Sequence, residues 1–251
     1  MSKESIMTST DIALVTGARG GVGSALVARL RARGLRVAAV GRDAASLASV
    51  EADAHIVSDV TTPEGAAAAL EGCRSELGDA PAWLAHAVGS TLITPLHRTK
   101  ADAARDILRV NLESSIWILQ AWLEATGKQP GAAVFASSVV ARIGVANHEA
   151  IAAAKGGVEA LVRSAAATYA ARGIRVNAVA PGMTDTPMTA GMLSVPMQRE
   201  GAEKQYPLGG VQTADDVAAV MDWLLSTDAG RITGQVIPVD GGFTTVRPLV
   251  K

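Results

Sequence analysis

Residues 12–34 read IALVTGARGGVGSALVARLRARG, and this stretch decides the fold. Four apolar residues lead into a loop with glycines at positions 17, 21 and 23, and apolar residues at helical spacing follow. A buried strand, a glycine-rich turn and a helix in this order are typical of the first unit of a dinucleotide-binding sheet. Glycines allow the backbone to approach a pyrophosphate, and the helix amino terminus favours its charge. The pattern predicts a phosphate cradle, with these contributors: Gly17, Arg19, Gly21, Val22 and Gly23.

Further along the chain, short apolar runs alternate with longer segments of helical periodicity. Such alternation predicts βαβ units and a parallel sheet covered on both faces. We therefore expect one Rossmann-type, doubly wound α/β domain over residues 1–251, a three-layer α/β/α sandwich, with a disordered tail at residues 1–10. The predicted strands are Ile12–Val15, Val37–Val40, His55–Val57, Trp83–Ala87, Ala133–Ala136, Arg175–Ala178 and Gln235–Val239.

Composition excludes several classes of protein. With 49% hydrophobic residues, 19% charged residues and a net charge of -1, the 251-residue chain is neither disordered nor suited to binding nucleic acid or anionic membranes. A small-molecule substrate is expected instead. The single cysteine, Cys73, cannot form a disulfide within the chain, and neither a signal peptide nor a long apolar span is visible, so we expect a cytoplasmic protein. No residue cluster has the spacing of metal ligands.

The end of the second predicted strand bears on the choice of dinucleotide. A carboxylate there would bind the ribose 2′-hydroxyl of NAD, but the chain has Gly41 followed by Arg42. Together with Arg19, Arg42 could bind the 2′-phosphate of NADP. The alternative is that both arginines are solvated and that Asp43 favours NAD. Asp59, after the third strand, is placed either to bind the adenine amino group or to form a turn.

Ordered motifs along residues 11–243 resemble the classical branch of the short-chain dehydrogenase/reductase family. They are TGARGGVG at 16–23, Asp59-Val60, Asn111 in RVNLESS, Ser138 in FASSVV, Lys155 in AAAKGGVEAL, RVNAVAPGMTDTPM at 175–188 and ITGQVIPVDGG at 232–242. The resemblance implies an oxidoreductase in which Asn111, Ser138 and Lys155 are catalytic. It also implies a tetramer and further cofactor contacts at Val60, Gly89, Lys155, Pro181, Gly182 and Thr186.

Two departures from the family pattern affect the predicted chemistry. The family's NNAG motif here reads His86-Ala87-Val88-Gly89. The family's tyrosine acid stands thirteen residues after the serine and four before the lysine, where this chain has Ile151. Isoleucine cannot donate the proton that an alkoxide product needs.

Four groups are left as proton donors. Ser138 is a poor acid alone, Lys155 would bind ribose, and Tyr206 is a distant candidate. His148 precedes Ile151 by three residues, so a continuous helix would place both on one stripe with Lys155. An imidazole titrates near neutrality, which suits proton transfer. In the alternative interpretation, His148 belongs to the helix amino-terminal turn and faces solvent.

Two surfaces suggest contacts beyond the core. Four methionines lie in or near residues 187–210: Met183, Met188, Met192 and Met197. They favour a substrate lid over the alternative of a plain surface helix.

Segments 106–125 and 150–171 are apolar around much of their circumference, which indicates either a subunit interface in a dimer or tetramer or an unusually buried helix.

Two functions fit the sequence. The first is an NADP(H)-dependent oxidoreductase with altered acid/base machinery, acting on a small, partly apolar carbonyl, alcohol or activated alkene. The second is a non-catalytic nucleotide-binding subunit that partners or regulates another dehydrogenase. Retention of Ser138 and Lys155 favours the first function, because an unused site has no physical need for them.

Overall fold

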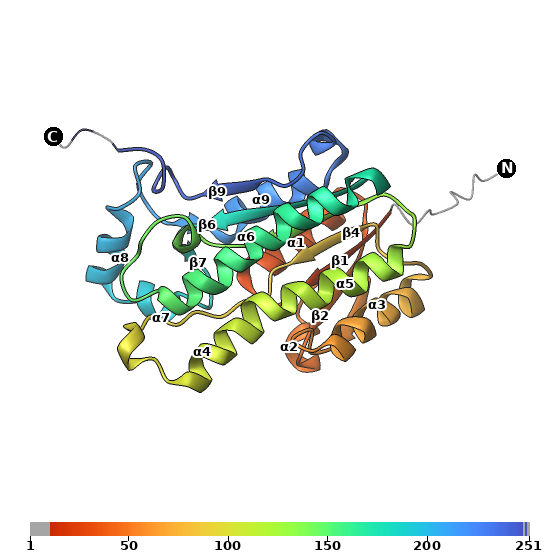
Figure 1. The fold of residues 1–251 in the computed structure, drawn as a ribbon, viewed down its shortest axis with the longest axis horizontal. Coiled ribbons are helices and arrows are strands. Elements are labelled where there is room, and N and C mark those ends of the chain that lie inside the picture. Colours follow the sequence, from red (N-terminus) through yellow and green to blue (C-terminus); the bar gives the residue numbers. More distant parts are fainter. Residues whose placement is uncertain (1–10, 248, 250–251) are drawn as a thin grey trace.

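The computed structural model describes residues 11–247 and 249; the tail predicted at residues 1–10 lies outside them (Figure 1). Seven strands, all parallel, form one sheet in the order β3-β2-β1-β4-β5-β6-β9. The predicted doubly wound fold is confirmed, and every predicted strand is present with small differences at its ends. The strands are β1 Ile12–Thr16, β2 Arg36–Gly41, β3 Ala54–Val57, β4 Trp83–His86, β5 Gly131–Ala136, β6 Ile174–Pro181 and β9 Val236–Val239.

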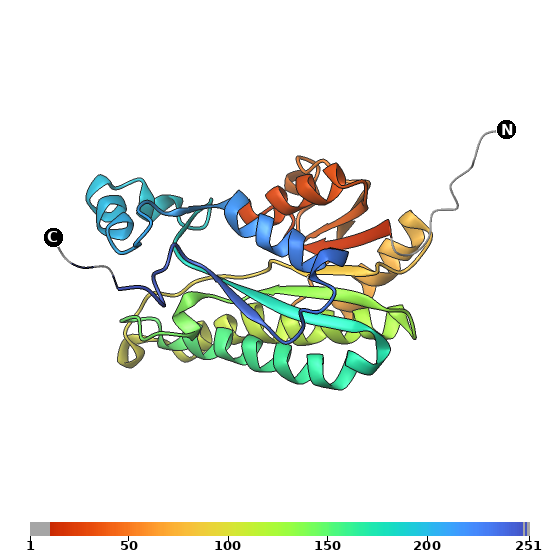
Figure 2. The ribbon, with the colours of Figure 1, turned by 90° about the horizontal axis from the view of Figure 1, so that it is seen from above.

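Helices cover both faces of the sheet, as Figure 2 shows edge-on. One face packs against α1 (Gly21–Ala32), α2 (Ala44–Leu47) and α9 (Ala214–Leu225), and the other against α3 (Pro63–Leu77), α5 (Ser114–Thr126) and α6 (Glu149–Tyr169). Strand β1 illustrates why its sequence is apolar throughout. Ile12 and Leu14 enter the core under α3, α5 and α6, whereas Ala13 and Val15 enter the core under α1 and α9.

The remaining elements gather at the carboxyl ends of the strands, at the left of Figure 1. They are α4 (Ala101–Leu108), α7 (Ala190–Leu193), α8 (Pro196–Glu203) and a two-stranded sheet of β7 (Thr184–Asp185) and β8 (Gln212–Thr213). Strand order reverses between β1 and β4, so the crevice that binds ligands in open α/β sheets is expected at the ends of these two strands.

Helix α5 corrects the interface argument made from sequence. A π-helical turn, Arg109–Glu113, joins α4 to α5, so the apolar segment 106–125 is not one regular helix. Trp122 is wholly buried within the chain, and its indole N–H donates to the carbonyl of Pro81 at 2.8 Å. It cannot supply a second face to a partner. Trp117 is only half-buried and remains the stronger indication of an interface.

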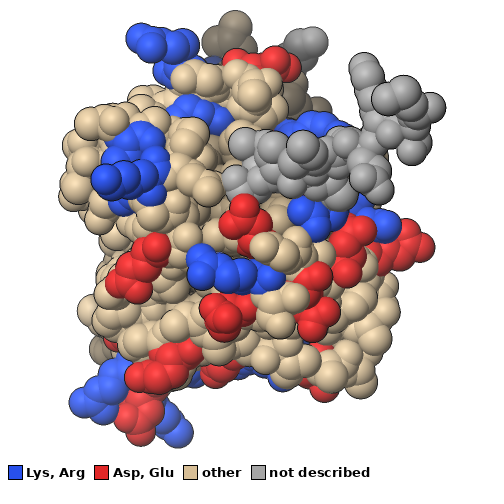
Figure 3. Space-filling view, turned by 90° about the vertical axis from the view of Figure 1, so that its right-hand side faces the viewer, with Lys and Arg blue, Asp and Glu red and all other residues tan. Residues whose placement is uncertain are grey.

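On the face seen in Figure 3, basic and acidic side chains are intermingled. Within residues 11–247, no helix combines the length and apolarity needed to span a membrane. The same part of the chain holds no group of three or more His, Cys, Asp or Glu side chains arranged to bind a metal.

Candidate active site

The glycine-rich loop joins β1 to α1 at the switch point of the sheet. Gly17 has a φ of 69°, and a Cβ there would lie 2.7 Å from the carbonyl carbon of Ala87, after β4. A Cβ on Gly23 would lie 2.2 Å from the Gly17 carbonyl oxygen. Both positions therefore require glycine, for backbone conformation and for close packing respectively.

The loop also contacts a distant predicted cofactor residue. A Cβ on Gly21 would lie 2.8 Å from Cγ2 of Thr186, in the segment after β6. Pro181 and Gly182 close β6 on the same side, and Gly182 packs against Tyr206. The structure thus brings the predicted phosphate cradle and the predicted nicotinamide segment together.

Three predicted residues meet beyond β4. A Cβ on Gly89 would lie 3.1 Å from Oδ1 of Asn111 and 3.5 Å from Nζ of Lys155. The Asn111 amide is oriented by Ser90, whose N–H donates to Oδ1 at 3.2 Å, and its own Nδ2 donates to the carbonyl of Ile107 at 3.0 Å. A side chain at position 89 would crowd the amide of Asn111, so the glycine allows Asn111 and Lys155 to lie close to the backbone after β4.

Lys155 is the buried cation of this site. It is 6% exposed, and its Nζ donates to the carbonyl of Ala136, at the end of β5, at 2.7 Å. Burial lowers the pKa of its ammonium group to about 8. A proton on Lys155 is therefore exchangeable near neutral pH.

Ser138 lies where β5 ends, in a turn held against α6. Its hydroxyl accepts a hydrogen bond from the Val140 N–H at 3.4 Å. The neighbouring Ser137 hydroxyl donates to Oε1 of Glu159, on α6, at 3.1 Å. Ser138 and Lys155 are thus fixed by the same strand end, because Lys155 binds the carbonyl of Ala136.

Ile151 is a buried apolar residue of α6 and carries no acidic group. It is 4% exposed and packs in a cluster with Ile107 and Ala154, flanked by Leu92 and Val140. Tyr206, the distant candidate, is 7% exposed, and its hydroxyl accepts the Met183 N–H at 2.5 Å. Burial raises the pKa of Tyr206, so this phenol is a weaker acid than usual.

The expectation that His148 shares a helical stripe with Ile151 and Lys155 is wrong. Helix α6 begins at Glu149, and His148 precedes it with φ -113° and ψ 17°. The chain turns at Asn147, whose φ is 65°, so His148 is the capping residue of α6 and not a residue within the helix, and its carbonyl accepts from the Ala152 N–H at 2.8 Å. Its Nδ1 lies 2.7 Å from the Ala146 carbonyl oxygen and donates to it.

Sequence reasoning recorded His86 only as a departure, but the structure gives it a bridging role. Its Nε2 lies 3.0 Å from the Ser114 hydroxyl, which itself donates to the Val110 carbonyl at 2.6 Å. Nε2 therefore carries the hydrogen, and Nδ1 accepts from the Thr16 hydroxyl at 2.7 Å. Burial, and secondly the Lys155 charge, lowers the pKa of His86 to about 3, so the ring stays neutral. It connects the glycine loop to the turn that carries Asn111.

At the other end of the crevice, Asp43 is already engaged. Its carboxylate accepts the Ser46 N–H at 2.8 Å and caps α2. Arg19 and Arg42 are both exposed, and within residues 11–247 neither forms an ion pair with a carboxylate. Asp59 lies near enough for the Arg42 charge to help lower its pKa, after the hydrogen bonds from Thr61. At this end of the crevice, the guanidinium groups of Arg19 and Arg42 are thus free of salt bridges within the described part of the chain.

Residues 187–210 project beside the site. Arg199 on α8 binds Asp185 of β7 and, at 3.3 Å, Glu203. Met188 and Met197 are exposed, as expected of side chains available to a ligand or to solvent. The backbone N–H of Leu208 donates to the Gly241 carbonyl at 3.1 Å, which ties the end of the segment to the chain beyond β9.

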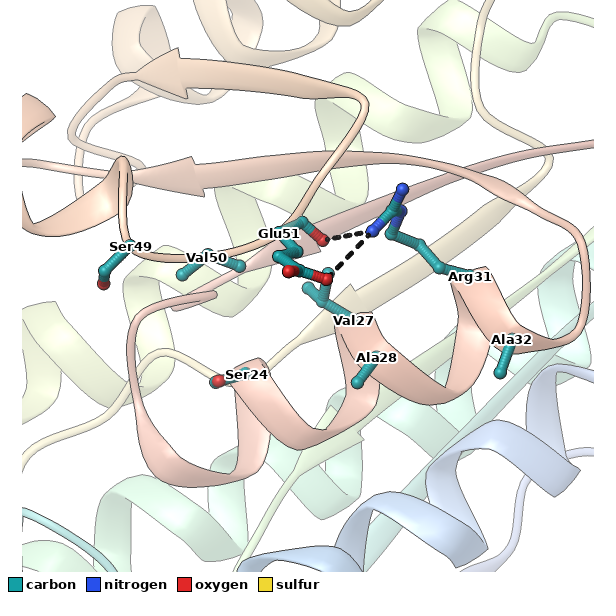
Figure 4. Close-up of a pocket in the computed structure, with 8 residues that line it drawn as sticks. All are labelled: Ser24, Val27, Ala28, Arg31, Ala32, Ser49, Val50 and Glu51. Atoms are coloured by element: carbon teal, nitrogen blue, oxygen red, sulfur yellow. Dashed lines mark hydrogen bonds and ion pairs between the residues drawn. The ribbon is translucent and has the colours of Figure 1, made fainter.

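A hollow of about 520 Å³ lies elsewhere, between α1 and residues 49–51 (Figure 4). Arg31 bridges it by binding Glu51. A second hollow of about 350 Å³ lies along α4 and includes Arg109. Neither contains a predicted site residue, so the candidate site rests on the strand ends.

Comparisons with known proteins agree with this geometry. The family model described as Enoyl-(Acyl carrier protein) reductase matches residues 17–244. Cis-4-hydroxycyclohexanecarboxylate dehydrogenase of Sinomonas cyclohexanicum is 36% identical over 243 residues, covering 94% of this chain and 97% of the relative. The chain belongs to the short-chain dehydrogenase/reductase family. It is accordingly classed as an NAD(P)-dependent oxidoreductase.

Two further relatives support the same family. The 3-oxoacyl-(acyl-carrier-protein) reductase FabG of Pseudomonas aeruginosa is 35% identical over 241 residues, covering 92% of this chain and 96% of its own. An oxidoreductase of the short-chain dehydrogenase/reductase family from Burkholderia thailandensis superposes with a TM-score of 0.85 at 34% identity, covering 94% of this chain and 93% of its own. The resemblance noted from sequence is confirmed.

Proposed function

We propose that the chain is an NADP(H)-dependent oxidoreductase with altered acid/base machinery. The observation that carries this proposal is the convergence of Asn111 Oδ1 and Lys155 Nζ on the backbone at Gly89, beside the ends of the strands. A bound nicotinamide cofactor supplies hydride transfer. The chain's own residues supply binding, orientation and the proton.

The residues at the crevice suit a dinucleotide. Gly17, Gly21 and Gly23 let the loop pack closely on its neighbours at the amino end of α1, whose backbone N–H groups would bind a pyrophosphate, with Val22 in the same turn. Pro181, Gly182 and Thr186 would hold the nicotinamide end, and Lys155 the ribose. Arg19 and Arg42 favour the 2′-phosphate of NADP, because Asp43 is occupied as a helix cap. Asp59 and Val60 would contact the adenine.

We propose that Ile151 takes the position of the family's tyrosine, so that the proton comes from another group. Asn111 and Ser138 would orient the substrate oxygen by hydrogen bonding. Lys155, with its lowered pKa, and His148, ahead of α6, are the remaining titratable donors. Tyr206 is disfavoured because its hydroxyl is engaged with the backbone.

The partly buried side chains of Leu92 and Val140, which pack on the cluster of Ile107 and Ile151, favour a small, partly apolar substrate. A carbonyl, an alcohol or an activated alkene fits, and the names of the relatives include a dehydrogenase of a cyclic hydroxy acid and a 3-oxoacyl reductase. Residues 187–210 would cover this substrate as a lid. The reduced, buried Cys73 suits a cytoplasmic location, and burial raises its pKa to about 12.

The second candidate is a non-catalytic nucleotide-binding subunit. The burial of Ile151 in an apolar cluster favours it, because the side chain at this position has no proton to donate. The two candidates differ in whether the purified chain turns over on its own.

Cofactor preference tests the proposed adenosine site. We expect NADPH to bind at least several-fold more tightly than NADH, because two guanidinium groups meet the additional phosphate. Arg42→Ala should weaken NADPH binding while leaving NADH binding nearly unchanged. Fluorescence titration of both cofactors measures this. Equal affinities in the wild type would mean that neither arginine reaches the phosphate.

Assembly is tested independently. Trp117 on α5 and Leu161 on α6 are only partly buried, and both helices lie in the same outer layer (Figure 2). We expect a homodimer or homotetramer that buries these side chains, which sedimentation velocity at micromolar concentration will detect. If the protein sediments as a monomer, α5 and α6 are ordinary surface helices and the predicted interface does not exist.

A further inference from the structure

A chain of hydrogen bonds links the π-helical turn to the strand end at Asp59. The guanidinium Nη1 of Arg109 donates to the hydroxyl of Thr61. The same hydroxyl contacts Oδ1 of Asp59 at 2.8 Å, and the Thr61 backbone N–H donates to that oxygen at 3.1 Å. Residues nearly fifty positions apart are thereby joined.

The direction of each hydrogen bond follows from chemistry. A guanidinium group can only donate, so the Thr61 oxygen accepts from Arg109 and its single hydrogen is directed to Asp59. Asp59 Oδ1 therefore receives two hydrogen bonds from Thr61. Among the described residues, Oδ2 has no hydrogen-bond partner, so this oxygen alone is free to accept from a ligand.

Arg109 is itself fixed, and its charge acts on Asp59. Its Nη2 donates to Oδ1 of Asp106, one helical turn earlier, at 2.6 Å. Burial pushes the pKa of Asp59 up, but the Thr61 hydrogen bonds and the charges of Arg42 and Arg109 outweigh it and hold the pKa below its ordinary value. Thr61 is 4% exposed, so water does not compete freely for its hydroxyl.

We propose that Arg109, acting through Thr61, sets the orientation of Asp59 and so makes the site selective for a purine with an exocyclic amino group. Arg109 is a positioning residue, because it touches Thr61 and not the base. The proposal rests on the proposed dinucleotide function. The proposal adds that Arg109, in the π-helical turn after α4, determines which base the site accepts.

The test compares NADPH with its hypoxanthine analogue, in which a carbonyl oxygen replaces the amino group. An oriented carboxylate oxygen attracts the amino group and repels the carbonyl. A hydrogen bond to a charged group supports about a ten- to hundredfold preference for NADPH in the wild type. Calorimetric titration measures both affinities without turnover.

Arg109→Ala and Thr61→Val should reduce this preference to threefold or less, whereas Thr61→Ser, which keeps the hydroxyl, should retain it. Arg105→Ala is the matched control. Arg105 also pairs with an aspartate three residues earlier, Asp102, at 3.0 Å, but among the described residues it has no contact with Thr61. The Arg105→Ala variant should prefer NADPH over the hypoxanthine analogue by the same factor as the wild type.

The outcomes separate this inference from the proposed function. If the wild type binds neither nucleotide, the proposed function fails and the inference with it. If the wild type prefers NADPH and Arg109→Ala keeps the full preference, the inference is overturned while dinucleotide binding stands. Equal binding of both nucleotides by the wild type would also overturn it, because Asp59 would then not read the base.

Discussion

Ile151→Tyr should raise ketone reduction by about 10²–10⁴, the usual contribution of a general acid. The substitution places a phenol on α6 one turn before Lys155, whose ammonium group favours ionisation of a neighbouring hydroxyl. Ser138 lies at the adjoining strand end, and both would meet the same substrate oxygen. A steady-state assay of NADPH oxidation over a ketone panel measures the gain.

Ile151→Phe is the control for this experiment. Ile151 is closely packed with Ile107 and Ala154, so either ring strains the cluster, at a cost of about 1–3 kcal/mol. Phenylalanine shares that strain but lacks the hydroxyl. If tyrosine gains nothing over phenylalanine on any ketone, the pocket is remodelled beyond the lost phenol, and the non-catalytic candidate becomes the better one.

His148→Ala then identifies the native donor. Loss of wild-type turnover with unchanged cofactor affinity would assign the proton to His148 despite its place ahead of the helix. Unchanged turnover would assign it to Lys155, Ser138 or water. The structure favours the second result, because the ring already donates to the Ala146 carbonyl and is not on the Lys155 stripe.

Lys155→Met should lower turnover by about 10²–10³, as expected when a preorganised charged donor is removed from a buried site. The fold should survive. A buried ammonium with a lowered pKa costs stability at neutral pH, and methionine removes that cost while leaving the Ala136 carbonyl without its donor. We expect the melting temperature to stay within about 2–4 °C of the wild type.

The pH profile gives a second readout. Because the pKa of Lys155 is lowered to about 8, its charged form is lost as pH rises through that value, and wild-type turnover should fall above about pH 8. Lys128→Met, the same change at an exposed lysine, should leave rate and profile unchanged. Wild-type turnover in Lys155→Met would remove this residue from the mechanism.

The fold and the close packing of the glycine loop could be predicted because they depend on local sequence. Strand β1 is apolar on both faces, and Gly17 and Gly23 are required by backbone contacts that the glycine pattern already indicates. The position of the nicotinamide segment followed from the family resemblance. Its contact with Gly21 is visible only in three dimensions.

Other features depend on tertiary contacts that no spacing reveals. His148 was misplaced because Asn147 adopts a positive φ and delays the start of α6. The interface predicted for segment 106–125 does not include Trp122, because α3 and Pro81 already cover this side chain, which a count of apolar residues does not show. In the sequence, the signal for His86 was a polar residue at the end of an apolar strand. Its two partners are also polar residues at the ends of buried elements, because Thr16 ends β1 and Ser114 begins α5.

We propose that this chain alone transfers hydride between NADP(H) and a small substrate. The most direct measurement counts product formed per NADPH oxidised by the purified protein over carbonyl, alcohol and enone substrates, in both directions. The control is the double variant Gly21→Val/Arg42→Ala, which fills the loop against Thr186 and removes a phosphate ligand. We predict one-to-one turnover that this double variant abolishes. Absence of turnover by the wild type at saturating NADPH, on every substrate, would contradict the account.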